Sequence, residues 1–369
     1  MTEPKIIAFH LPQFHEIEEN NLWWGQGFTE WTNVRKASPM FRGHRQPRVP
    51  KDDRYYDMMD SATRAWQAEL ARSKGIHGFC YYHYWFKGRQ LLEKPVDALI
   101  AEGKPDFPFC LAWANEAWTR TWDGGERNVL MGQSYGEQAD WDRHFAYLLK
   151  AFRDPRYICV DGKPVFLIYR TASIDDMPAM LARWRALAAQ AGLPGLHIVS
   201  MLTGRPPDAR LELFDARAEF EPMHTLSHHL SWAHRRREKL VRHFAKLRRR
   251  FVADARPHKL NTHDYAALWK QVVRRPLGAN TYPGAFADWD NSARVGLRAI
   301  VLRNFDKLAF RSGLAAQLRK ARERQAPFLF FNAWNEWAEG TYLEPDAENG
   351  SFFLDTIAEL TASARHTPP

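Results

Sequence analysis

The chain has 369 residues and a formal net charge of +9 at neutral pH, and 45% of its residues are hydrophobic. This length and composition allow a large core, and a single (β/α)8 barrel routinely reaches this size. The sequence has neither a run of ~18 apolar residues for a membrane span nor an N-terminal leader pattern, so we expect a cytoplasmic protein. The cysteines, Cys80, Cys110 and Cys159, are odd in number and are interpreted as small buried residues of a reducing compartment.

Strand-like and helix-like patterns alternate along the chain. Helices are expected at 61–73, 140–152 and 177–191. Parallel strands need long crossovers, usually helical ones, so this alternation predicts a single (β/α)8 barrel over residues 1–369. The alternative, a doubly wound sheet, would gather its ligand residues at one switch point. The expected strands lie at 5–11, 77–83, 107–114, 164–169, 196–201, 215–220, 279–283 and 328–334.

Polar and aromatic residues gather where these strands end. A barrel brings the C-terminal ends of its strands together at one face, so we expect such residues to bind substrate there. The alternative is a hydrogen-bonded barrel rim, or for the early loop residues an ordinary loop. The candidate substrate-binding residues are His10, Gln13, Glu30, Trp31, His83, Trp85, Asn115, Glu116, Trp118, Glu219, Tyr282, Asn335 and Trp337.

The segment 328–340 is the most informative stretch. Its apolar start, Phe328-Leu-Phe-Phe331, is typical of a strand buried on both faces, and it leads directly into Glu336 and Glu339 among tryptophans. Paired carboxylates can serve as acid and base in glycosidic bond cleavage, while aromatic rings stack on sugars. The pair is therefore the candidate catalytic site. The alternative is a solvated turn with two unrelated glutamates.

The net charge is concentrated in one segment. Between Arg235 and Arg250 nine residues are Lys or Arg and only Glu238 is acidic, a local net charge of +8. Residues 240, 244, 247 and 251 are Leu, Phe, Leu and Phe, an apolar stripe at helical spacing. We expect a basic helical insertion at 226–262, after the sixth strand. Its partner would be an anionic membrane surface or an acidic glycan, and nucleic acid has no supporting fold pattern. The alternative is a stripe packed on the barrel with a solvated basic face.

Several motifs resemble those of the WbsX-like proteins, named as glycosyltransferases of lipopolysaccharide biosynthesis. These proteins in turn resemble glycoside hydrolase family 99, the endo-α-mannosidases. The second resemblance rests mainly on the last motif and the barrel. Asp290 belongs to the WbsX-like signature and is expected to line the groove. The segments that carry the first resemblance lie at 8–15, 24–34, 78–86, 113–119, 283–291 and 335–340.

The resemblance to the mannosidases implies a retaining mechanism without metal. Glu336 would deprotonate the sugar's own 2-hydroxyl, which attacks the anomeric carbon to give a 1,2-anhydro sugar. Glu339 would protonate the leaving oxygen. Ala338 stands where the mannosidases carry His, so mannose specificity does not follow.

Two Asp-x-Asp triplets, Asp140-Trp-Asp142 and Asp288-Trp-Asp290, suggest a different chemistry, since metal-dependent glycosyltransferases hold a nucleotide-sugar diphosphate with such triplets. The first triplet begins a helix, where acids suit the dipole, and no Gly-rich phosphate loop follows a strand. We therefore predict no cofactor and no metal.

Together these features predict a carbohydrate-active enzyme of bacterial surface polysaccharide metabolism, at the inner membrane if the basic segment docks there. The alternatives are a glycosyltransferase with a lipid-linked or nucleotide donor and a non-catalytic glycan-binding barrel.

Overall fold

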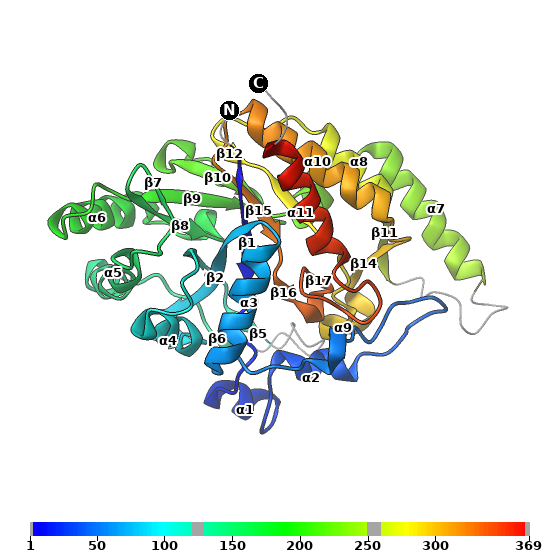
Figure 1. Cartoon of the computed structure of the whole chain (residues 1–369), viewed down its shortest axis with the longest axis horizontal. Coiled ribbons are helices and arrows are strands. Elements are labelled where there is room, and N and C mark those ends of the chain that lie inside the picture. The colour runs from blue at the N-terminus through cyan, green and yellow to red at the C-terminus, as the bar shows by residue number, and fades with distance from the viewer. Residues whose placement is uncertain (1–2, 120–128, 249–259, 366–369) are drawn as a thin grey trace.

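The computed structural model describes residues 3–119, 129–248 and 260–365. A ring of eight parallel strand positions lies at its centre (Figure 1). Every neighbouring pair is parallel, and the row of paired strands runs from β12 to β13, which are consecutive in the chain, so the ring closes at this position and the predicted (β/α)8 barrel is confirmed. In ring order the strands are β1 (Lys5–His10), β2 (Ile76–Phe86), β4 (Phe109–Trp113), β8 (Lys163–Ile168), β9 (His197–Leu202), β10 (Ala216–Glu219), β12 (Thr281–Tyr282) with β13 (Gly284–Phe286), and β15 (Phe328–Asn332).

The seventh strand position is split at Pro283. β12 pairs with β10 and β13 pairs with β15, while Pro283 lacks the N–H that a continuous ladder needs. At Gly284 an added Cβ would lie 2.2 Å from the backbone oxygen of Glu219, so only glycine allows this approach to β10. Pairing therefore covers 281–286, whereas the sequence pattern predicts 279–283.

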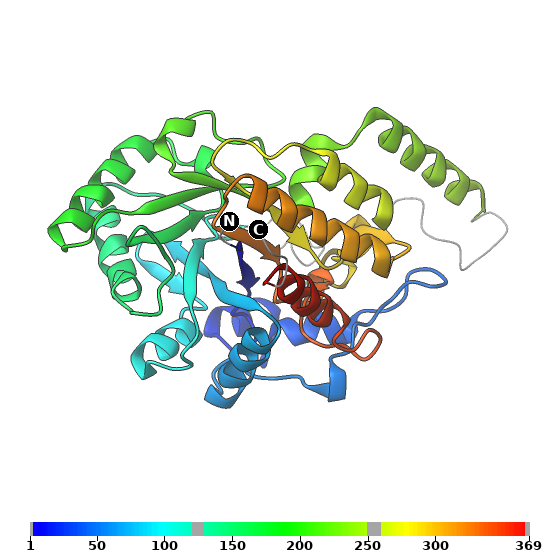
Figure 2. The same ribbon diagram turned by 45° about the horizontal axis from the view of Figure 1, so that its top comes forward.

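Helices surround the ring (Figure 2). The helices expected at 61–73, 140–152 and 177–191 are present as α3, α5 and α6. The helices of this layer are α3 (Ser61–Ser73), α4 (Lys94–Glu102), α5 (Gln138–Phe152), α6 (Met177–Gln190), α8 (Tyr265–Arg274), α10 (Lys307–Glu323) and α11 (Phe352–Arg365).

Shorter elements cover the C-terminal ends of the strands, at the bottom of Figure 1. They include α1 (Glu18–Trp24), α2 (Glu30–Lys36), α9 (Ser292–Val295), the 3-10 turn η7 (Trp337–Glu339), and the strand pairs β5 (Trp118–Thr119) with β6 (Val129–Met131) and β16 (Asn335–Glu336) with β17 (Thr341–Tyr342). At the side of the barrel β11 (Asn261–Asp264) pairs with β14 (Ile300–Arg303). β3 (Arg89–Leu91) folds back antiparallel on the end of β2, and β7 (Cys159–Val160) pairs antiparallel with the start of β8.

Aromatic side chains fill the barrel interior. The ring of Phe9 on β1 lies 5.9 Å from that of Tyr82, 5.4 Å from Phe220 and 5.5 Å from Phe330, so strands far apart in sequence meet around it. A second aromatic layer fills the space between the strands and α5 and α6, where Trp113 and Trp184 pack against His144. Many of the chain's aromatic side chains are therefore part of the core.

Several buried histidines are held in the neutral state. His83 and His144 are joined by a 2.8 Å hydrogen bond between their Nε2 atoms, and His10 Nε2 bonds Gln67 Oε1 at 3.1 Å. Burial lowers the pKa of His10 to about 3 and that of His83 to about 3, and it also lowers the pKa of His144. Protonation of these rings would leave buried charges without counter-ions, so neutrality is required by the fold.

We expect stability to fall with acidification because of these rings. An unfolded histidine takes up its proton near pH 6.5, whereas folded His83 does so only near pH 3. Stability is therefore lost as pH falls from about 6.5 towards 3, by up to about 1.4 kcal/mol per pH unit for each such histidine. His83→Gln should reduce the pH dependence of the unfolding free energy by the contribution of one histidine. Chemical denaturation at several pH values measures this. The exposed His243→Gln should leave this pH dependence unchanged, and an equal effect of the two changes would contradict the assignment.

Helix α7 (Trp232–Arg248) extends along the side of the barrel, away from the ring (Figures 1 and 2). It lies within the segment where a basic helix is expected. The side chains of Leu240 and Phe244 are exposed, so this part of the predicted stripe does not pack on the barrel. Leu247 and Phe251 of that stripe fall outside the side chains that the structure describes. In the described residues no helix is long and apolar enough to cross a bilayer.

Candidate active site

A cavity of about 210 Å³ lies at the C-terminal ends of the strands. Two further depressions adjoin it. One shares Gln13, Trp118 and Arg294 with the cavity and adds Trp24 and Phe28. The other is a wider groove that shares Glu116. The cavity itself is lined by Leu11, Gln13, Tyr82, Tyr84, Ala114, Glu116, Trp118, Tyr169, Phe220, Met223, Trp289, Asn291, Arg294, Glu336 and Glu339.

The two candidate catalytic glutamates project from a turn that is fixed at both ends. Asn335 Oδ1 accepts a 2.7 Å bond from Leu11 N, and its Nδ2 donates to Leu11 O at 3.0 Å, which ties the turn to the end of β1. The Glu339 carbonyl accepts from Asp290 N at 2.8 Å. Gly340 follows with φ 64°, where an added Cβ would lie 2.9 Å from Asp290 backbone atoms. Glycine is thus needed here both for the left-handed conformation and for the close approach.

A buried network supports the same turn from behind. The Trp337 ring stacks on Tyr342 at 3.8 Å, and its Nε1 donates to Glu344 Oε2 at 2.7 Å. Glu344 also accepts from the Tyr56 hydroxyl at 2.9 Å and from Gln67 Nε2 at 2.7 Å. Burial raises the pKa of Glu344 to about 7 against these donors. Such a shell holds catalytic side chains in place before substrate arrives.

Arg294, from α9, is bonded to three carboxyl groups. Its Nη1 lies 2.7 Å from Glu339 Oε1, and its Nη2 lies 2.5 Å from Glu30 Oε1 and 3.3 Å from Glu336 Oε2. The guanidinium is 9% exposed at its side chain, so water screens these contacts poorly. One buried cation therefore faces three carboxyl groups, more negative charge than it can balance if all of them ionise.

Burial, and then this excess of negative charge, shift the pKa values of the pair upward. Burial, and then the neighbouring Glu339, raise the pKa of Glu336 to about 8, although Arg294 opposes the shift. Burial also raises the pKa of Glu339, again opposed by Arg294. Glu336 is more buried than Glu339 and lies farther from the guanidinium. The pair therefore holds a proton to higher pH than ordinary carboxyls do, and the two side chains share it.

Tyrosines form the wall opposite the carboxylates. Tyr82 and Tyr84 point inward from β2, and Tyr169 follows β8. Burial and then the charge of Glu336 raise the pKa of Tyr82 and of Tyr84 well above the usual value, so both remain phenols. The cavity thus combines hydrogen-bond donors with aromatic faces, which suits a polyhydroxylated ligand.

The structure brings six of the residues singled out from the sequence to the cavity or the aromatic depression beside it. Asn115 lines the wider groove, where its side chain holds Arg170 through both backbone atoms. The six are Gln13, Glu30, Glu116, Trp118, Glu336 and Glu339.

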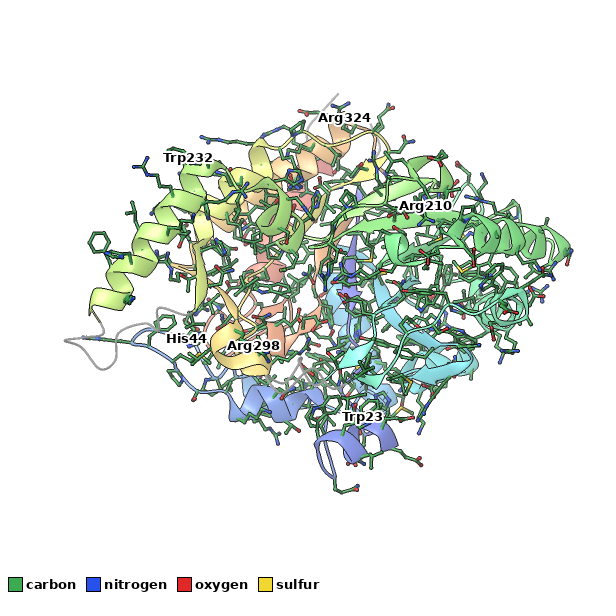
Figure 3. The ribbon with its side chains drawn as sticks, turned by 180° about the vertical axis from the view of Figure 1, so that it is seen from behind. Trp23, His44, Arg210, Trp232, Arg298 and Arg324 are labelled. Carbon is green, nitrogen blue, oxygen red and sulfur yellow. The ribbon has the colours of Figure 1, made fainter. Side chains whose placement is uncertain are left out.

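Four other candidates lie behind the cavity and support it. Asn335 and Trp337 anchor the turn that carries Glu336 and Glu339, as described above. Trp31 packs on Trp337 at 5.6 Å and donates from Nε1 to Tyr56 O. Asp290 is buried and accepts from His44 Nε2 and Gln46 Nε2, both at 2.9 Å, which ties the loop around His44 to α9 (Figure 3). These residues position the site without lining the cavity.

Five candidates lie away from the cavity, in the layer outside the strands or at the other end of the barrel. His10 bonds Gln67 on α3, and His83 and Trp85 pack on His144 of α5. Glu219 pairs with Arg275 at 2.8 Å, and the Tyr282 hydroxyl bonds His197 at 2.7 Å. Alternate residues of a strand face opposite sides. Since Tyr82 and Tyr84 face inward, His83 and Trp85 must face the helices.

The sequence interpretation missed Arg294, Tyr82, Tyr84 and Tyr169. The tyrosines lie in strands buried on both faces, where the pattern does not reveal which face is interior. A signal for Arg294 did exist, because two buried carboxylates require a nearby cation.

Both Asp-x-Asp triplets are engaged in other contacts. Asp288 pairs with Arg48 at 2.9 Å, and the bond from His44 helps to lower the pKa of Asp290 to about 2 against its burial. Asp142 pairs with Arg183 at 2.7 Å, and Asp140 bonds Arg143. Within the described ranges, no group of three or more His, Cys, Asp or Glu side chains is arranged to hold a metal.

Solved structures share this fold. A glycoside hydrolase-like protein superposes with a TM-score of 0.60 and 15% identity, covering 98% of this chain and 94% of the other. The GH99 endo-alpha-mannosidase from Bacteroides thetaiotaomicron superposes with a TM-score of 0.56 and 13% identity, covering 99% and 98%. At these identities the likeness concerns the fold alone. The protein is thus a (β/α)8 barrel with a buried carboxyl pair at its strand ends.

The model of the family Glycosyltransferase WbsX matches residues 6–357, and the chain belongs to this family. Two proteins named "Uncharacterized protein WxcX", from strain B100 and a second strain of Xanthomonas campestris pv. campestris, are each 37% identical over 365 residues. The matches cover 97% of this chain and 50% of each relative, so the chain spans about half the length of these curated relatives.

Proposed function

We propose that the chain is a carbohydrate-active enzyme that breaks a glycosidic bond with retention, using Glu336 and Glu339. The supporting observation is that these two buried carboxyls lie together beside one guanidinium, in a cavity walled by aromatic rings and hydroxyls, where burial raises the pKa of both. A carboxyl that keeps its proton near pH 7 can act as a general acid, and its ionised partner can act as a base. No step in this chemistry requires a cofactor.

The roles follow from the resemblance to the endo-α-mannosidases. Glu336 accepts the proton of the sugar 2-hydroxyl as that oxygen attacks the anomeric carbon and forms a 1,2-anhydro sugar. Glu339 gives its proton to the leaving oxygen, and a second oxygen nucleophile then opens the epoxide. In the free protein the two carboxyls share a proton, and this mechanism requires that proton on Glu339 when the first step begins.

The second oxygen nucleophile decides between two activities. Water would make the protein a glycoside hydrolase, and a sugar hydroxyl would make it a transferase, the alternative that its family name supports. The glycan class we propose is bacterial surface polysaccharide. Ala338 is fully buried and supplies no side chain to the cavity, so the sugar preference is set by other residues. A non-catalytic glycan-binding barrel, the third possibility, would leave the shared proton without a role.

The experiment is to incubate purified protein with defined oligosaccharides, α-mannosides and rhamnose-type glycans first, with and without an acceptor sugar. New reducing ends without acceptor indicate hydrolysis, and a longer product formed only with acceptor indicates transfer. Glycan binding without turnover under both conditions would overturn the proposal in favour of a binding module.

The pH dependence of kcat/KM provides a further prediction. Burial and the neighbouring Glu339 raise the pKa of Glu336 to about 8, so the pair should lose its shared proton, and activity should decline, above about pH 8. It should also decline in acid, where the second carboxyl is protonated. We therefore expect a bell-shaped profile of initial rates. Activity that keeps rising through pH 9 would show that the fully ionised pair is the active form.

A further inference from the structure

Helix α7 is attached to the barrel by polar side chains. His234 Nε2 lies 3.2 Å from His263 Nδ1 on β11, and Arg303 at the end of β14 reaches Glu238 at 3.1 Å. His234 and Glu238 are 6% and 3% exposed. They are four residues apart and share the inner side of the helix. Buried polar side chains therefore hold this part of α7 to the barrel.

Large apolar side chains lie on the opposite side of α7. Trp232 is 71% exposed, Leu240 52% and Phe244 65%. Their spacing of eight and four residues places them along one stripe. Figure 3 shows Trp232 at the start of α7, at the periphery of the molecule. Single exposed apolar residues are common on proteins, but three along one helix mark an interaction surface.

Cations surround this stripe. Arg235, Arg236, Arg237, Lys239 and Lys246 are all exposed, and the guanidinium of Arg236 lies over the Trp232 ring at 5.1 Å. The single acidic residue of α7 is the buried Glu238. Among the described residues, only Arg237 of these five cations has an acidic side chain within 4 Å, Asp264 at 3.9 Å. The outer side of α7 thus combines exposed apolar groups with a strong positive charge.

We propose that the outer side of α7, defined by Trp232, Arg236, Lys239, Leu240 and Phe244, docks on an anionic membrane surface. Apolar side chains enter the boundary between headgroups and acyl chains, and the cations pair with lipid phosphates. A soluble polyanion such as nucleic acid or an acidic polysaccharide would engage the cations and can stack on aromatic rings, but it offers no hydrocarbon phase for Leu240. This inference does not depend on the proposed chemistry of the barrel.

Vesicle flotation with the full chain tests this docking. Wild-type protein should float with phosphatidylcholine vesicles that contain phosphatidylglycerol and not with pure phosphatidylcholine, and added salt should weaken binding. The variant Leu240→Ser/Phe244→Ser should bind at least about tenfold more weakly. The variant Arg236→Gln/Lys239→Gln should lose about fivefold per charge, the factor that corresponds to ~1 kcal/mol.

The matched control is Leu308→Ser on α10. Leu308 is 77% exposed and follows an exposed lysine, as an apolar residue beside a cation on another helix. This variant should bind vesicles as the wild-type protein does. All the substituted side chains are exposed, and unchanged thermal melting would verify folding. Equal flotation with neutral vesicles, or full binding by the Leu240→Ser/Phe244→Ser variant, would overturn the proposal. The proposal would also be overturned if the wild-type protein is a dimer and the Leu240→Ser/Phe244→Ser variant is a monomer. A second copy of the chain would then cover the outer side of α7.

Discussion

Glu336→Gln and Glu339→Gln are each expected to lower kcat by about a thousandfold on any glycan that the wild-type protein turns over. Each change removes one participant of the carboxyl pair while keeping the shape of the side chain. Initial rates at pH 7 provide the measurement. Glu69→Gln, at an exposed glutamate on α3, is the matched control and should keep wild-type rates. Wild-type turnover by both site variants would refute the assignment.

The two variants should differ from each other in leaving-group dependence. If Glu339 is the acid, a substrate whose leaving group needs no protonation, such as an aryl glycoside with an acidic phenol, should restore much of the rate of Glu339→Gln. It should not restore Glu336→Gln, which has lost the base. The reverse pattern would assign the acid to Glu336 and the base to Glu339.

Stability adds an independent check on Glu336. The folded-state pKa of about 8 lies above the unfolded value near 4.5, so the wild-type protein loses stability as pH rises between these values. Glutamine removes this buried titration. Glu336→Gln should therefore be more stable than wild type in denaturation at pH 9, despite its loss of activity. Lower stability of Glu336→Gln than of wild type at pH 9 would indicate that neighbouring groups stabilise the ionised Glu336 carboxylate in the folded protein.

Arg294→Met should produce the second large effect, on both stability and activity. Removal of the guanidinium leaves three carboxyl groups without their cation, which we expect to cost about 3 kcal/mol near pH 8.5. Without Arg294 the pKa values of Glu336 and Glu339 rise further, because Arg294 lowers both. Because the folded-state pKa values of these two carboxyls are raised, the loss of stability in Arg294→Met grows with pH and is smaller at pH 5. Chemical denaturation at the two pH values measures this.

Arg275 offers a matched control for Arg294. It pairs in the same way with Glu219 and Glu221, at 2.8 Å and 2.6 Å, but outside the cavity. Arg275→Met should also lose stability, while the alkaline limb of its kcat/KM profile stays near pH 8. In Arg294→Met that limb should move to higher pH. An identical shift in both variants would show that Arg294 acts only through the fold. Arg294→Lys should recover part of the stability but not the forked geometry.

The sequence was sufficient for the barrel because strand and helix patterns alternate, and parallel strands joined by helices have few solutions. It was less informative about the seventh strand, where Pro283 divides the pairing and the apolar pattern is short. Glu336 and Glu339 could be singled out because they follow a strand buried on both faces. Because β2 is also buried on both faces, its sequence does not show that His83 and Trp85 face the helices while Tyr82 and Tyr84 face the cavity.

The support of the site depends on contacts that have no local sequence pattern. Arg294 lies 264 residues from Glu30 in sequence, and only the folded chain brings them together. Asn335 and Trp337 looked like sugar ligands because amide and indole groups commonly fill that role. In the structure they bond Leu11 and Glu344 instead, and they hold the turn from which the glutamates project. A search for the cation that a buried carboxyl pair requires would have been the most direct sequence route to Arg294.

The most direct test of the central proposal is a proton NMR time course of the first product formed by the wild-type protein from a glycan that it cleaves. We predict that the new anomeric signal has the configuration of the substrate bond before mutarotation, and that it is absent with Glu336→Gln. An inverted first product, or an equal signal with the variant, would contradict retention through the Glu336 and Glu339 pair.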